Sequence, residues 1–122
     1  MSKEDRTISF SIEDMVFEYD EAKNQANIKK HHISFKAAAR VFFDRNRIEL
    51  YDEENSIFED RFDTIGNAAI GMTGTTCDIL FVVYTDRVRQ MVDGVIIDVT
   101  RIISARYATE FERGLYYGKI ND

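Results

Sequence analysis

The stretch ILFVVYTDRVRQMVDGVIIDVTRIISA, residues 79–105, decides the fold of this chain, because it predicts two long paired strands. Residues 79–84 are apolar without alternation, which is typical of a central strand covered on both faces. Asp93 and Gly94 are a strong signal for a two-residue turn. Residues 95–105 are therefore expected to pair back antiparallel to the strand before the turn.

Two more strands are predicted upstream of this pair. Residues 48–52 and 58–65 flank the polar loop 53–56, which is the pattern of a hairpin. Three glycines punctuate the connection that follows: Gly66, Gly71 and Gly74. Together the four strands are expected to form an antiparallel meander.

Two helices are predicted before the meander. Asp20 is a good N-cap for a helix that continues to about His31. Ser34 is a second N-cap, for a short helix that runs through Phe42. A bend between the two helices is expected at residues 32–33.

The two ends of the chain add one element each. Thr109 is positioned to cap a final helix. The apolar residues of this helix are expected to pack on the sheet: Phe111, Leu115 and Tyr116. Residues 7–13 alternate, which predicts a short additional strand. The predicted fold class is therefore α+β, with two N-terminal helices, a four-stranded antiparallel sheet and a C-terminal helix.

Composition indicates one folded domain. The chain has 122 residues, 44% of them hydrophobic and 31% charged, and it contains no proline that would mark a linker. No apolar run approaches the roughly 20 residues that a membrane helix needs. The start lacks the apolar core of a signal peptide, and the single Cys77 cannot form an internal disulfide. A cytoplasmic protein without a membrane partner is expected.

The charge is unevenly distributed. The net charge of −6 argues against non-specific binding of nucleic acid, which depends mainly on Lys and Arg. Residues 17–47 nevertheless hold seven bases against four acids, whereas residues 48–63 hold one base against seven acids. If folding places the two regions on different parts of the surface, the protein has one basic and one acidic side. If it does not, the charges are scattered over a solvated surface.

Two ordered blocks of residues carry a resemblance to a known family. The first block is F-E-Y-D-E-A-K at residues 17–23, followed by Asn27, Lys30, His31, Ile33, Phe35 and Ala38. The second is R-I-I-S-A-R at residues 101–106, followed by Ala108, Glu112, Arg113 and Tyr116. In this order the blocks resemble BrnT-type toxins. The departures are Tyr19 in place of Trp, His32 in place of Gly, an extension at residues 1–16 and a longer hairpin at residues 86–100.

The resemblance implies a RelE-like ribonuclease domain over residues 17–122, with residues 1–16 as an extension. It implies RNA cleavage that inhibits translation. It also implies neutralisation by an antitoxin with a ribbon-helix-helix DNA-binding domain. Operator DNA would then be bound only through the antitoxin.

Three arginines are the main candidates for catalysis: Arg61, Arg101 and Arg106. RNA cleavage without a metal uses the ribose 2′-OH as nucleophile, and it needs cations that stabilise charge on the phosphate. Arg suits this role because its planar fork binds two phosphate oxygens. On a regular strand Arg101 would point to the same side as Val99 and Ile103. It therefore either emerges among apolar side chains or lies at a bulge. The alternative for each arginine is a surface charge or an ion pair with the acidic hairpin.

The first helix offers a second group of candidates. Asp20, Lys23, Asn27 and Lys30 or His31 recur every three or four residues, which predicts one polar face. Ala22 and Ala26 would mark the side that faces the core. In the functional interpretation Lys23 and Lys30 bind phosphate and His31 exchanges a proton. In the alternative the face is simply solvated, and the helix dipole favours His31 at the C-terminus.

Tyr84 and Arg113 complete the candidates for RNA binding. Tyr84 could stack on a base, although a core tyrosine is the simpler interpretation. Arg113, next to Glu112, could bind RNA or the antitoxin. No residue spacing matches a metal or cofactor site, so neither is expected.

Two functional hypotheses remain open from the sequence. In the first the chain is a metal-independent endoribonuclease. In the second it is a binding module of the same family with weak or no catalysis, and it acts through the antitoxin and operon repression. The net charge of −6 favours the second modestly.

Overall fold

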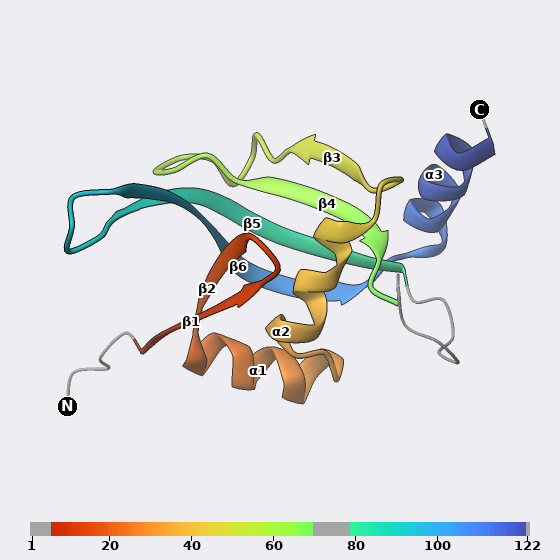
Figure 1. Cartoon of the computed structure of the whole chain (residues 1–122). Helices are drawn as coiled ribbons and strands as arrows, with labels where there is room; N and C mark the ends of the chain where they lie inside the picture. Colours follow the sequence, from red (N-terminus) through yellow and green to blue (C-terminus); the bar gives the residue numbers. More distant parts are fainter. Residues whose placement is uncertain (1–5, 70–78, 122) are drawn as a thin grey trace.

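The computed structural model describes residues 6–69 and 79–121, the latter with side chains to residue 118. In chain order the elements are β1 (Thr7–Ile12), β2 (Met15–Asp20), α1 (Glu21–His31), α2 (Phe35–Ala38), the 3₁₀ helix η1 (Ala39–Phe43), β3 (Ile48–Tyr51), β4 (Phe62–Asn67), β5 (Ile79–Gln90), β6 (Ile96–Tyr107) and α3 (Glu110–Asn121). The strands form one sheet in the order β1-β2-β6-β5-β4-β3 (Figure 1). The α+β class is confirmed.

The long hairpin β5–β6 forms the centre of the sheet, as predicted. Its tip differs from the prediction, because the amide of Met91 donates to the carbonyl oxygen of Val95 at 2.8 Å and the loop spans three residues, 92–94, instead of two. The amide of Gly94 donates to the carbonyl oxygen of Met91 at 2.9 Å, and Gly94 adopts a φ of +89°. A type I turn followed by a left-handed glycine is the usual form of a three-residue hairpin loop. The tip projects beyond the neighbouring strands (Figure 1).

The predicted meander is present, but the predicted four-stranded sheet is incomplete. Strands β3 to β6 pair antiparallel in sequence order. In addition, the hairpin β1–β2 joins the sheet through a parallel pairing of β2 with β6, in which Phe17 lies opposite Thr100 and Glu18 opposite Arg101. The strand β2 was missed because Phe17, Glu18 and Tyr19 are all buried, so the segment lacks the alternation of a half-exposed strand.

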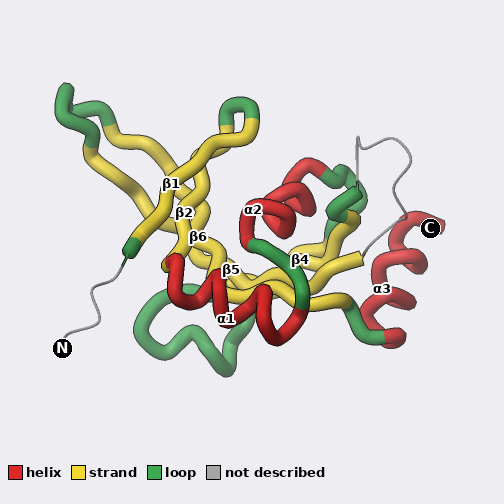
Figure 2. The backbone as a smooth tube through the Cα atoms, turned by 90° about the horizontal axis from the view of Figure 1, so that it is seen from below, coloured by secondary structure: helices red, strands yellow, loops and turns green. Residues whose placement is uncertain are grey.

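The N-terminal helices begin and bend where predicted. The amide of Lys23 donates to Asp20 at 3.1 Å and that of Ala37 to Ser34 at 3.1 Å, which are N-cap hydrogen bonds. His32, with a φ of +62°, ends α1 in the left-handed conformation. The helix α1 packs against β6 (Figure 2).

The helix α1 faces the sheet with a different side from the one predicted. Ala22 and Ala26 are exposed, and the buried residues of α1 are Asn24 and Asn27. Asn27 accepts a hydrogen bond from the amide of Ala105 at 3.1 Å and donates to the carbonyl oxygen of Ile33 at 2.9 Å. Asn27 therefore attaches α1 to β6 and Asn24 attaches it to the start of α2, through the amide of Phe35, and hydrophobic periodicity does not reveal such attachments.

The core has two parts, one on each face of the sheet. The larger part packs Tyr84, Val82 and Ile102 against α2, η1 and the hairpin β1–β2. The smaller part packs Ile65 and Ile79 against Tyr116 of α3. The prediction for α3 was correct only for Tyr116, because Phe111 and Leu115 are exposed.

Gly66 lies inside β4 and does not belong to a connection. A Cβ atom there would lie 3.2 Å from the Cβ of Val41 and 3.1 Å from that of Arg47, so glycine allows η1 to pack directly on the strand. The other residues named in this region, Gly71, Gly74 and Cys77, lie outside the described residues. Within the described part of the chain, no helix is long and apolar enough to cross a membrane.

Candidate functional site

Arg101 and Arg106 lie on the same side of the sheet, the side opposite α2 and η1. Tyr84 faces the helices, so the next residue, Thr85, faces the other side, and Thr85 pairs with Arg101. Phe81 also faces this side and pairs with Arg106, whose guanidinium lies 4.1 Å from the centre of its ring. We call this side, which carries Phe81, Thr85, Arg101 and Arg106, the arginine face.

A β-bulge makes this arrangement possible. Residues five apart on a regular strand point to opposite faces. The register of β5 with β6 shifts between Val83, opposite Ser104, and Tyr84, opposite Ile102, which leaves Ile103 as an extra residue. Arg101 itself pairs regularly with Thr85 and shares its side of β6 with the buried Val99, so it emerges beside an apolar side chain. The bulge lies two residues further on, at Ile103.

Arg101 is held by a buried carboxylate. Glu18 is 8% exposed, and its two oxygens accept hydrogen bonds from Arg101 at 2.6 Å and from Arg89 at 2.9 Å. Burial alone would raise the pKa of Glu18. The hydrogen bonds and positive charges of Arg101 and Arg89 outweigh this effect and hold the pKa below its ordinary value.

Arg106 is held by the first turn of α3. Its two terminal nitrogens donate to the two oxygens of Glu112 at 2.7 and 3.0 Å, which is a bidentate pair. Glu112 also accepts from the amide of Thr109 at 2.8 Å, and Thr109 caps the amide of Glu112 in return. The predicted cap of α3 therefore also orients Arg106.

Arg61 lies at the start of β4, two strands away from β6. Phe62, which follows it, pairs with Tyr84, so Arg61 comes close to Thr85 in the register. Its terminal nitrogen is 3.8 Å from Glu59, which pairs more closely with Arg87 at 3.0 Å. Among the described residues, Nε of Arg61 is a buried donor without a hydrogen-bond partner.

The candidates on α1 come together at the bulge. Lys23, Lys30 and His31 line a cavity of about 250 Å³, whose other wall includes Ile103 and Ser104 of β6. We call it the α1–β6 groove. Since Ile103 and Ser104 lie between Arg101 and Arg106 in the sequence, the groove adjoins the stretch of β6 that carries both arginines.

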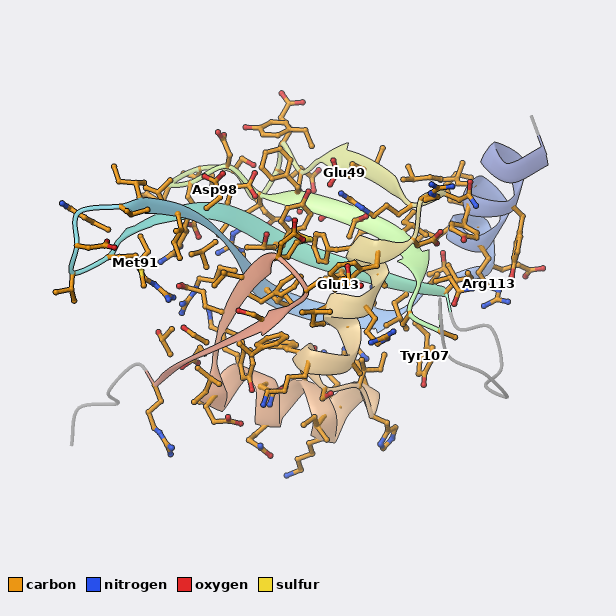
Figure 3. The ribbon with its side chains drawn as sticks, in the orientation of Figure 1. Glu13, Glu49, Met91, Asp98, Tyr107 and Arg113 are labelled. Atoms are coloured by element: carbon orange, nitrogen blue, oxygen red, sulfur yellow. The ribbon has the colours of Figure 1, made fainter. Side chains whose placement is uncertain are left out.

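Tyr84 lies in the core, whereas Arg113 lies on α3, one residue after the Glu112 that pairs with Arg106. The ring of Tyr84 is buried between those of Phe42, at 4.9 Å, and Phe62, at 5.5 Å, which leaves no ring face for a base. Burial and its hydrogen bond to Glu49 raise the pKa of this tyrosine. Arg113 is on α3, at the opposite end of the molecule from Met91 in the β5–β6 turn (Figure 3).

Sequence reasoning missed Asp63, a half-buried carboxylate of β4. Asp63 pairs with Val83, which in turn pairs with Ser104, so the three residues form a row on the arginine face. Burial and the nearby Asp52 raise the pKa of Asp63 to about 6. The only sequence signal was its position in the strand two residues after Arg61. Within the described parts of the chain, no group of three His, Cys, Asp or Glu residues is placed to hold a metal ion.

Comparison with known proteins identifies a family for the chain. A family model described as the ribonuclease toxin BrnT of a type II toxin–antitoxin system matches residues 19–112. No curated protein matches the chain. The matched residues include both walls of the α1–β6 groove, the arginine face and Arg61.

Proposed function

This chain belongs to the BrnT family of ribonuclease toxins of type II toxin–antitoxin systems, and on that premise we propose that it is a metal-independent endoribonuclease whose site lies along β6. One observation carries the proposal. Lys23, Lys30 and His31 line a groove against the segment of β6 between Arg101 and Arg106. Two groups of candidates from distant parts of the sequence therefore adjoin one another.

The arginines supply the positive charge that the reaction needs at the phosphate. Each guanidinium has five N–H donors, and a bidentate carboxylate occupies only two of them. Arg106 can therefore remain paired with Glu112 and still donate to a phosphate oxygen. Rigid positioning of this kind favours the charge that develops in the transition state, because little reorganisation is needed.

The groove on α1 supplies the remaining functions. Lys23 and Lys30 are exposed, and we assign them to phosphates of the RNA strand on either side of the cleaved bond. His31, in the last turn of α1, exchanges a proton with the reacting nucleotide. Arg61 binds the same strand from the start of β4.

The partner that follows from this function is an antitoxin. We propose that it carries a ribbon-helix-helix DNA-binding domain, covers the arginine face, and connects the toxin to operator DNA. Free toxin would cut cytoplasmic RNA and so inhibit translation. Arg113 and the exposed Phe111 on α3 are available to this partner.

The decisive experiment compares the parent protein with an Arg101→Ala/Arg106→Ala double variant. The parent is expected to arrest growth when induced and, once purified, to cut RNA in the presence of EDTA. The double variant should lose both effects at equal soluble expression. A Lys29→Ala/Arg45→Ala variant, which removes two exposed charges away from the site, is the control and should behave like the parent. Arrest and cleavage by the arginine variant would disprove this assignment.

A second candidate function is the binding module without useful catalysis. It is favoured by the carboxylates beside all three predicted arginines, namely Glu18, Glu59 and Glu112. These carboxylates reduce the net positive charge that RNA would meet. Cleavage by the parent in EDTA that is lost in the arginine variant would exclude this candidate.

A further inference from the structure

Asp63 occupies a central position on the arginine face. Its row, Asp63–Val83–Ser104, ends in the α1–β6 groove. Two further pairs of residues lie on either side of this row on the same face of the sheet. One is Thr85 with Arg101, and the other is Phe81 with Arg106. Asp63 therefore lies among the groups that are proposed to bind the reacting phosphate.

The hydrogen bonding of Asp63 differs from that of the other carboxylates on this face. Glu18 and Glu112 have an arginine nitrogen against each of their oxygens. The Asp63 carboxyl, in contrast, has a side-chain hydrogen bond with another acid, Asp52, and its Oδ1 is buried without a hydrogen-bond partner among the described residues. A buried acceptor without a partner is costly in a purely structural role, and such groups are frequent at reactive sites.

The charged groups around Asp63 come from three directions. Asp52, which follows β3, and Glu112 of α3 both raise its pKa, whereas Arg106 of β6 lowers it. Together with burial, which is the largest cause, they give a pKa of about 6. At neutral pH this carboxyl is mostly ionised but close to its pKa, which is the condition that favours a general base.

We infer that Asp63 is the general base of the RNA cleavage, the group that takes the proton of the ribose 2′-OH. This inference rests on the proposed function and adds to it, beside the proton exchange assigned to His31, the group that accepts the 2′-OH proton. Arg is always protonated in proteins and cannot accept a proton.

The step balances without a metal or a cofactor. The Asp63 carboxylate accepts the 2′-OH proton while the O2′–P bond forms. The P–O5′ bond breaks, and the leaving 5′-oxygen takes a proton from His31. The products are a 2′,3′-cyclic phosphate and a 5′-hydroxyl. Protonated Asp63 then gives its proton to water and His31 regains one from water, so that both residues return to their starting state.

The test measures RNA cleavage against pH for four proteins. The parent is expected to show a rate that rises with pH and levels off above about 6. Asp63→Asn should lower the plateau by roughly 100-fold. Asp52→Asn should keep the plateau but move the rise to lower pH by about half a unit or more, because a negative neighbour is removed. Asp98→Asn, an exposed aspartate of β6, is the control and should match the parent.

A second measurement shows that a loss of activity does not come from unfolding. Ionised Asp63 is unfavourable in the folded state, so Asp63→Asn should unfold at pH 8 at an equal or higher urea concentration than the parent. A loss of activity without a loss of stability is not expected from a structural residue.

The possible failures can be told apart. If the parent does not cut RNA, the proposed function is wrong and this inference falls with it. If the parent cuts RNA but Asp63→Asn cuts it at the same rate, or if Asp52→Asn leaves the pH profile unmoved, the proposed function stands and Asp63 is not the base.

Discussion

The buried carboxylate of Glu18 accepts hydrogen bonds from both Arg89 and Arg101. Replacing it in Glu18→Gln leaves two guanidiniums without a counter-charge, which should reduce the free energy of unfolding at pH 7 by about 2 kcal/mol. Urea unfolding measures this difference. The exposed Glu53→Gln is the control and should change stability little.

The effect of Glu18 should depend on pH in one direction. Its pKa is lowered by folding, so its contribution is complete above the ordinary value of 4.5 and is lost as the pH falls through the folded value. The difference between parent and Glu18→Gln should therefore shrink below pH 4.5. A difference that stays constant down to acid unfolding would contradict this account.

For single residues, the sequence pointed to the candidate arginines but not to the groups that surround them in the folded protein. Arg101 could be placed at a bulge or among apolar side chains because its parity conflicts with the neighbouring pattern. Asp63 could not be recognised, since its raised pKa comes from Asp52, Glu112 and burial, all of which require the assembled sheet. Tyr84 is a core residue, as the simpler of its two interpretations held.

Among the elements, α1 depends on Asn27 for its position on β6. Asn27→Ala removes two buried hydrogen bonds, one to the carbonyl oxygen of Ile33 and one from the amide of Ala105. It should reduce the free energy of unfolding by about 2 kcal/mol. Gln25→Ala, on the exposed side of the same helix, is the matched control and should cost less than about 0.5 kcal/mol. Equal effects of the two changes would show that α1 is not attached in this way.

The contact between η1 and β4 should tolerate no added methyl group. In Gly66→Ala the new Cβ would lie 3.3 Å from the carbonyl oxygen of Val41, which is backbone and cannot move aside easily. A loss of roughly 1–3 kcal/mol is expected. Gly114→Ala in α3 has nothing within 4 Å and should instead stabilise the helix by up to about 1 kcal/mol. Thermal unfolding of the two variants should give shifts of opposite sign.

The helices and strands whose ends or partners are set by residues close in the sequence could be predicted. Asp20, Ser34 and Thr109 cap the helices as expected, because a cap acts within three residues. The meander from β3 to β6 follows the chain from one strand to the next. The strand β2 and the buried side of α1 were missed or misplaced, because both bury polar side chains that find partners in distant parts of the chain.

For the molecule as a whole, the net charge of −6 means that RNA must be bound by a local positive surface. The affinity for a 2′-deoxy analogue of the RNA should therefore fall with salt. In Lys23→Gln/Lys30→Gln the slope of log affinity against log salt should decrease in magnitude by about 1.4, at 0.7 for each lost phosphate contact. The control, Lys29→Gln/Lys36→Gln, changes the net charge equally and should keep the slope of the parent. Equal slopes for both variants would remove the lysines from the binding surface.

The parallel pairing of β2 with β6 also determines when the arginine face can form during synthesis. Glu18 bonds to Arg101, which lies 83 residues later in the chain. Until β6 has left the ribosome, the hairpin β1–β2 has no neighbour in the sheet and Glu18 has no arginine to hold. Contacts of such long range also slow folding. The arginine face therefore cannot form on the nascent chain before β6 has been synthesised, so the residues of β1 and β2 wait for a partner that is made much later.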